Sequence, residues 1–131
     1  MSEGPVQPQG WAAPRGYSNG YRLGNMLFVA GQIAWTADCV LVGAGDFGAQ
    51  FGQALHNVRA VLDAAGCPPE RVGRVTVYVT DKAAYLASLP AVGAAWRAQF
   101  GRHYPAMALV EVAALLEDGA MVEIEATAVL A

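Results

Sequence analysis

The chain has 131 residues, enough for one domain with a core, and its net charge of −3 without a basic run argues against a nucleic-acid surface. Only 15% of its residues are charged, against roughly 25% in ordinary soluble domains, so we expect another copy of the chain to cover part of its surface. The sequence shows neither a signal peptide nor an apolar run long enough to span a membrane, which predicts a cytoplasmic protein. Cys39 and Cys67 do not have the spacing of metal ligands, so we expect free thiols.

The first part of the chain is predicted to begin with an irregular arm. Residues 1–16 carry three prolines and three glycines, which disfavour both helix and strand. Residues 17–35 predict a hairpin that turns at Gly24–Asn25, and residues 39–42 predict a short third strand. In the hairpin, Gly31 marks a bulge or a place where another group approaches the backbone closely.

The middle of the chain is predicted to be mostly helical. Residues 46–65 repeat apolar side chains at three- and four-residue spacing, which predicts a helix with Asp46 as its N-cap. Residues 74–80 alternate strong β-formers and predict a strand. Residues 82–100 predict a short helix and then a longer one, with Ser88 as the N-cap of the second.

Two alternating runs dominate the C-terminal third. Residues 107–114 and 122–128 both show period-2 patterning around turn residues 116–119, which predicts an antiparallel hairpin. The second run places two carboxylates and a hydroxyl on one side, which therefore cannot be ordinary core: Glu123, Glu125 and Thr127.

The order of the elements predicts an α+β fold in a single domain over residues 1–131. We expect a mixed sheet of five or six strands with two helices on one face. Because two helices cannot cover both faces of such a sheet, the other face must be polar or buried by further subunits.

Carboxylates are the most informative candidates for chemistry. The sequence contains no phosphate-binding loop, no histidine pair at metal spacing and no nucleophile elbow, and His103 is interpreted as a connector residue rather than a general base. A carboxylate on a half-buried strand face tends to have a raised pKa, which suits the activation of a water molecule. Spacing alone does not separate Glu111, Glu123 and Glu125, and Glu125 or Glu111 could instead pair with an arginine or cap a backbone group.

Seven stretches together resemble one known family. They are Gly16–Gly20, Gly24–Ile33, Gln53–Gly66, Val75–Asp81, Tyr104–Ala106, Val110–Ala113 and Val122–Ala126. They are similar, in register from about residue 14 to residue 129, to the RidA family of reactive intermediate deaminases, also called the YjgF family.

The resemblance implies a chorismate-mutase-like α+β fold assembled as a homotrimer. The uncovered sheet faces would pack into a central barrel, and small-molecule ligands would bind in clefts between subunits. Active members hydrolyse reactive enamines and imines, such as 2-aminoacrylate, to a keto acid and ammonia, without a metal or an organic cofactor. Neither nucleic acid nor membrane is implied as a partner.

Several residues match the family's site. Tyr17 matches a tyrosine that lines the cleft, Gly31 a glycine whose backbone approaches the ligand, and Tyr85 an aromatic residue of the cleft wall. Glu123 matches the glutamate that positions the hydrolytic water.

The carboxylate-binding part of the pattern departs from the family. Members carry an arginine directly after Pro-Ala that clamps the substrate carboxylate, and here that residue is Met107. Leu109 replaces a frequent cysteine, and Leu89 a frequent asparagine. A replacement cation could come from Arg15 or, less well placed, from Arg102.

Three functions follow as hypotheses. The first is a hydrolase of an enamine or imine that is bulkier or less charged than 2-aminoacrylate. The second is a catalytically silent trimer that binds a small apolar or aromatic metabolite. Endoribonuclease activity, attached to some relatives, is disfavoured by the acidic charge balance.

Overall fold

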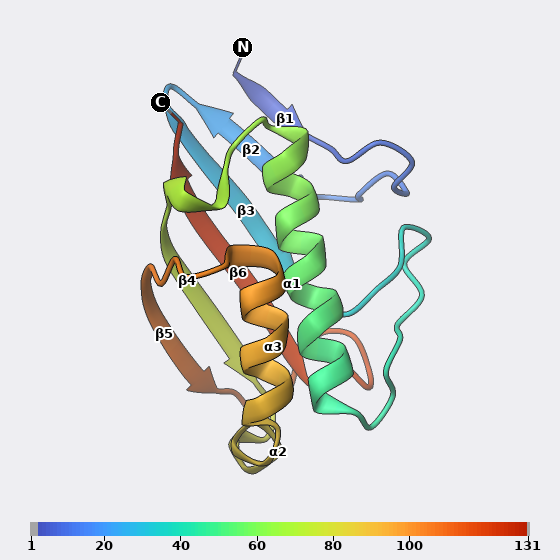
Figure 1. Ribbon diagram of the computed structural model, residues 1–131. Helices are drawn as coiled ribbons and strands as arrows, with labels where there is room; N and C mark the ends of the chain where they lie inside the picture. The colour runs from blue at the N-terminus through green and yellow to red at the C-terminus, as the bar shows by residue number, and fades with distance from the viewer. Residues whose placement is uncertain (1–2, 131) are drawn as a thin grey trace.

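Residues 3–130, which the computed structural model describes, form a six-stranded mixed sheet with all helices on one face (Figure 1). Every neighbouring pair of strands is antiparallel except β4 and β5, which are parallel. In spatial order the strands are β1 (Gly4–Val6), β2 (Gly20–Leu23), β3 (Met26–Gln32), β6 (Val122–Val129), β4 (Val72–Val79) and β5 (Ala106–Glu111). This arrangement confirms the predicted α+β class.

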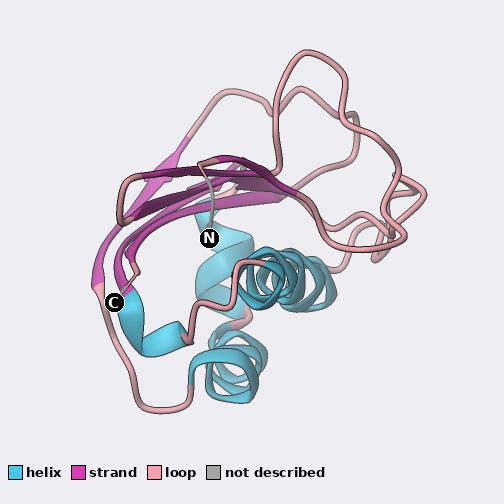
Figure 2. Ribbon diagram, turned by 90° about the horizontal axis from the view of Figure 1, so that it is seen from above, coloured by secondary structure: helices cyan, strands magenta, loops and turns pink. Residues whose placement is uncertain are grey.

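The helices lie together on one side of the curved sheet (Figure 2). They are α1 (Phe47–Ala64), α2 (Lys82–Ala87) and α3 (Leu89–Phe100), with a 3-10 turn at Pro69–Arg71. The Asp46 side chain accepts a hydrogen bond from Ala49 N at 3.0 Å, which confirms the predicted N-cap of α1. Ser88 is the N-cap residue of α3, as predicted, but its side chain makes no capping hydrogen bond, because its hydroxyl donates back to Ala84 O of α2 at 2.8 Å.

The N-terminal predictions are correct in part. The β2–β3 hairpin turns at Gly24–Asn25 as predicted. The prediction of an irregular arm is wrong at Gly4–Val6, because these residues form β1 and pair with β2 at the sheet edge. Pro5 has no backbone N–H, but on an edge strand this costs no ladder hydrogen bond. Residues 1–2 of the predicted arm lie outside the described residues. The predicted third strand at residues 39–42 does not form either, because this segment makes only a single bridge, between Trp35 and Leu41. Cys39 has a left-handed φ of 62°, which interrupts the extended backbone.

The predicted C-terminal hairpin does not exist. Strand β4 lies between β5 and β6, parallel to β5 and antiparallel to β6. The chain leaves β4 through α2 and α3 and returns as β5, and such a crossover connects parallel neighbours. Strand β6 then fills the position between β3 and β4. The alternating pattern indicated two-faced strands correctly, but it carries no information about which strands are neighbours.

The two faces of the sheet differ as the alternation predicted. Strand β6 buries Val122, Ile124 and Ala126 under the helices, whereas Glu123 and Glu125 lie partly exposed on the open face. That the open face is covered by further copies of the chain stays a prediction. Within residues 3–130, no helix has both the length and the apolar character that a membrane crossing requires.

Candidate active site

A cavity of about 240 Å³ opens where the end of β3 passes the beginning of β6. Three of the predicted site residues line it: Tyr17, Gly31 and Glu123. Strand β3 shifts register against β6 between Val29 and Gln32, so the predicted irregularity at Gly31 is present. The structure therefore brings together residues from three separate parts of the chain.

The carboxylate of Glu123 lies directly against the backbone of Gly31. A Cβ atom added to Gly31 would be 2.7 Å from Cδ and 2.8 Å from Oε2 of Glu123, closer than real contacts allow. The glycine thus gives the carboxylate its place in the cavity. Burial raises the pKa of Glu123 above its usual range, and the nearby charge of Glu125 raises it further.

The other two candidate carboxylates are engaged elsewhere. Glu125 accepts a hydrogen bond of 2.7 Å from the hydroxyl of Tyr78, and this bond is the main cause that raises the pKa of Tyr78. Glu111 accepts a bond of 3.0 Å from Lys82 N at the start of α2, which is the capping role left open by the sequence. Of the three, only Glu123 lines the cavity.

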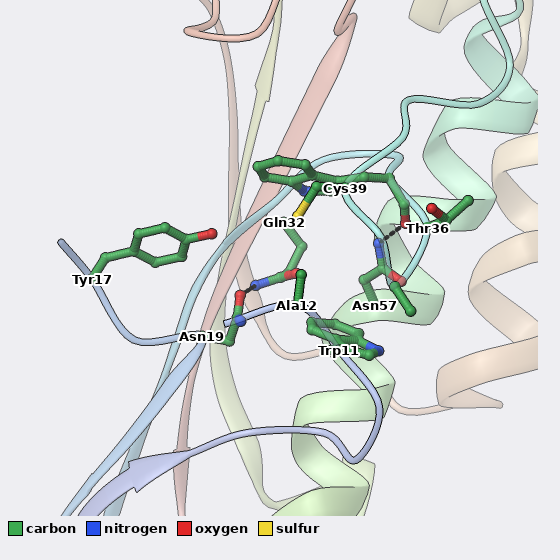
Figure 3. A pocket seen from close by; sticks show the side chains of 10 residues that line it. Trp11, Ala12, Tyr17, Asn19, Gln32, Thr36, Cys39 and Asn57 are labelled. Atoms are coloured by element: carbon green, nitrogen blue, oxygen red, sulfur yellow. Dashed lines mark hydrogen bonds between the residues drawn. The ribbon is translucent and has the colours of Figure 1, made fainter. Parts of the chain in front are cut away.

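Tyr17 borders the cavity and a smaller one behind it, of about 20 Å³, shown in Figure 3. The smaller cavity has room for about one water molecule and is lined by amide side chains. Here Gln32 Nε2 donates to Asn19 Oδ1 at 3.2 Å, and Asn57 Nδ2 donates to Trp35 O at 2.8 Å. Partial burial raises the pKa of Tyr17, and Cys39 adds to this effect.

The remaining predicted residues lie apart from Glu123. Met107 is opposite Val75 and so points to the helix side of the sheet, while Glu123 is opposite Tyr78 and points to the open side. Leu109 is exposed two residues from Met107 on the edge strand β5, and Leu89 is exposed at the start of α3.

Three further candidates also lie outside the cavity. Tyr85 packs edge-to-face on Phe47, with 5.9 Å between ring centroids. Arg15 lines a neighbouring pocket that shares Tyr17 with the cavity, whereas Arg102 lies in an open depression beyond the end of α3. Neither arginine lines the cavity of Glu123.

His103 has a structural contact, as its interpretation as a connector predicts. Its Nε2 atom lies 2.7 Å from Val72 O, and its own carbonyl accepts a bond of 3.0 Å from Trp96 Nε1. Among residues 3–130, no group of three His, Cys, Asp or Glu side chains is placed to hold a metal ion.

Five residues that line the cavity were not predicted as site residues from the sequence: Ala30, Ile33, Trp35, Leu116 and Glu117. Trp35 follows β3, and Leu116 lies in the connection between β5 and β6. The available signals were an aromatic residue close after Gly31 and an apolar residue inside a predicted turn.

Comparisons with known proteins agree with this fold. Residues 9–130 match the family model described as endoribonuclease L-PSP. The 2-iminobutanoate/2-iminopropanoate deaminase of Escherichia coli K12 is 40% identical over 116 residues, covering 86% of each chain.

Two solved structures are similar over nearly their whole length. The crystal structure of the Escherichia coli YjgF gene product has a TM-score of 0.79 and 35% identity, and covers 98% of both chains. That of the yeast protein YEO7 has a TM-score of 0.84 and 30% identity, and covers 99% of this chain and 100% of the other. The chain therefore belongs to the RidA/YjgF family, whose matching model bears the description endoribonuclease L-PSP.

Proposed function

We propose that the protein is a deaminase-type hydrolase of reactive enamines or imines, in which Glu123 positions and activates the attacking water. The observation that carries the proposal is the carboxylate of Glu123, held against Gly31 in a cavity that Tyr17 also lines. Its raised pKa brings the carboxyl group closer to neutral pH, where a general base is most effective.

The chemistry needs one group that moves a proton in both directions. Glu123 accepts a proton from water as the oxygen attacks the carbon of the protonated imine, which forms a neutral carbinolamine. The carboxyl group then returns this proton to nitrogen. As the C–N bond breaks, the carboxylate takes the hydroxyl proton and passes it to the departing ammonia, so that the carbonyl product and ammonium leave. An enamine first takes a proton on carbon to become the imine.

The proposed site is completed by a second copy of the chain. Met107 and Leu109 are exposed on the edge strand β5 and on the sheet face opposite to Glu123, so one chain cannot bring them and Glu123 around one ligand. Leu89 is exposed at the start of α3. All six residues of β5 are exposed, and an unpaired apolar edge favours association. A head-to-tail contact of this kind closes into a ring when the rotation between neighbouring copies is 120°, which is the arrangement of the trimer that the family resemblance implies.

We propose a substrate that is bulkier or less charged than 2-aminoacrylate. Met107 offers neither a charge nor a donor to a carboxylate, and each charge-assisted hydrogen bond missing there removes roughly 1.5–3 kcal/mol. The exposed apolar side chains around Met107 instead favour contact with an apolar part of the ligand.

Hydrolysis of imines generated in place by an amino-acid oxidase tests the proposal. We expect the protein to accelerate keto-acid formation, and Glu123→Gln to lower the rate by about a hundredfold or more. Glu125→Gln, on the same strand face, is the matched control and should retain most of the rate. Failure of the wild-type protein to accelerate any imine in a panel of small and large side chains contradicts the proposal.

A silent binding protein is the second candidate, favoured by the apolar group at Met107, Leu89 and Leu109. It predicts that small apolar ligands raise the melting temperature while no imine is turned over. A ribonuclease has less support: Arg59, Arg97 and Arg102 do line one depression, but Arg59 is paired with Asp63 at 2.9 Å and the net charge is −3. RNA binding that falls steeply with salt would support that activity.

A further inference from the structure

Trp35 and Leu116 form the apolar walls of the cavity that contains Glu123. Leu116 is 103% exposed, so among residues 3–130 nothing buries this apolar residue although it lines the cavity. At about 240 Å³ the cavity falls below the roughly 300 Å³ at which sites for drug-sized ligands begin, so it suits a molecule of amino-acid size.

Helix α1 holds Trp35 in place through side-chain amides. Asn57 Nδ2 donates to Trp35 O at 2.8 Å and to Ile33 O at 3.0 Å, and Gln53 Nε2 donates to Trp35 O at 3.2 Å. Gln53 also donates to Asn57 Oδ1 at 3.0 Å, which fixes the orientation of both amides. The segment that carries Trp35 is therefore anchored at a buried backbone carbonyl.

The same helix holds the wall that carries Leu116. Gln50 is 0% exposed, and its Nε2 donates to Gly119 O at 3.0 Å and to Gly43 O at 3.2 Å. Its Oε1 accepts a bond of 2.8 Å from Met121 N. Gln50, Gln53 and Asn57 are spaced by three and four residues and share one side of α1, and we call them the amide stripe. It anchors the backbone at Ile33 and Trp35 on one side of the cavity and at Gly119 and Met121 on the other before any ligand arrives, which lowers the entropic cost of binding.

We propose that Trp35 and Leu116 select the side chain of the substrate, that this side chain is aromatic, and that Gln53 and Asn57 of the amide stripe position Trp35. The proposal rests on the imine hydrolysis proposed above and names its substrate class. Trp35 and Tyr17 offer two aromatic side chains to a planar group. The charged residues that line the cavity, Glu117 and Glu123, are both acidic and disfavour an anionic side chain.

Paired imines test the selectivity of the wild-type protein. The imines made from phenylalanine and from alanine differ only in the phenyl group, and we expect a higher kcat/KM for the aromatic one. Trp35→Ala should lower this preference by about tenfold, the factor that 1.4 kcal/mol of lost stacking gives, and Trp35→Phe should retain most of it. Trp96→Phe, which removes a tryptophan packed on Phe100 outside the cavity, should leave the preference unchanged.

The positioning role needs a control for stability. Asn57→Ala should lower the aromatic preference, mainly through KM for the phenylalanine-derived imine. Val58→Ala, at the next and equally buried position of α1, should lower the melting temperature without changing the preference. Equal effects of the two variants on the preference would overturn the positioning role.

A binding experiment separates this inference from the proposed function. Phenylpyruvate and pyruvate are the stable products of the two imines, and calorimetry compares their affinities for wild-type protein and Trp35→Ala. If no imine is turned over but phenylpyruvate binds more tightly and loses that advantage in Trp35→Ala, the proposed hydrolysis fails and the aromatic site stands. If the wild-type protein binds both equally or prefers pyruvate, or if Trp35→Ala keeps the preference, the inference is wrong.

Discussion

Replacing Gly31 by alanine tests whether the position of the Glu123 carboxylate matters for catalysis. Gly31 is not among the glycines with a positive φ, so its backbone conformation accepts an alanine. The new Cβ atom would lie 2.8 Å from Glu123 Oε2, whereas ordinary contacts begin at 3.4 Å, so the carboxylate must retreat by roughly 0.6 Å. A misplacement of about 1 Å at a reacting group can cost a hundredfold in rate.

We therefore expect Gly31→Ala to lower kcat/KM for imine hydrolysis by about ten- to a hundredfold. Stability should change little, because the clashing atoms belong to the end of a flexible side chain that can turn away. The alanine also restricts the unfolded chain, which contributes about 0.4–1 kcal/mol of stabilisation. Steady-state kinetics on one imine and urea unfolding of the same preparation measure the two effects.

Two other glycines serve as controls. A Cβ atom on Gly73 meets no atom within 4 Å, so Gly73→Ala should keep both activity and stability. A Cβ atom on Gly20 would lie 2.6 Å from Cγ1 of the buried Val61, so Gly20→Ala should lose stability first. Full activity of Gly31→Ala, or an activity loss that only follows a loss of folded protein, would refute the role given to Glu123.

Three further predictions concern Glu123, Asn57 and Met107. The folded-state pKa of Glu123 is raised, so the stability that this group contributes is fully present below its unfolded pKa and is lost as pH rises through the folded value. Urea unfolding should therefore show that the free energy of unfolding of Glu123→Gln rises relative to that of the wild type between acidic and neutral pH. The same pH dependence of this free energy in both proteins would contradict the prediction. Asn57→Ala should lower the free energy of unfolding by about 2 kcal/mol, because the buried carbonyl of Ile33 loses its donor; a change below about 0.5 kcal/mol in the same assay would argue against it. Met107→Arg should raise kcat/KM for the imine of alanine by about tenfold or more relative to Met107→Leu, and an unchanged value would show that the missing guanidinium does not limit activity.

The helices and the first hairpin could be predicted because their signals are local. Asp46 caps α1, and Gly24 takes the left-handed φ of 58° at the β2–β3 turn. The neighbours of β5 and β6 could not be predicted, since both runs alternate in the same way whether or not β4 lies between them. The position of Ser88 at the start of α3 could be predicted, but not its hydrogen bond, because a serine hydroxyl can also bond the preceding turn, as it does here at Ala84 O.

Part of the candidate site could be predicted from family-matched residues, and part could not. Tyr17, Gly31 and Glu123, which the match names as site residues, line one cavity, and their roles stay a prediction. The amide stripe remained hidden because Gln50 and Asn57 look like ordinary polar positions until their partners, carbonyls from distant loops, are placed beside them.

By itself, the sequence determined the periods of its helices and strands, and that one face of the last strand had to carry carboxylates, because these properties depend on residues a few positions apart. Only the tertiary structure decided which groups lie beside each carboxylate. The β3–β6 register sets Glu123 against Gly31, while the β4–β6 register brings Tyr78 to Glu125. Register arises from the packing of strands that lie far apart in the chain, and no local pattern contains it.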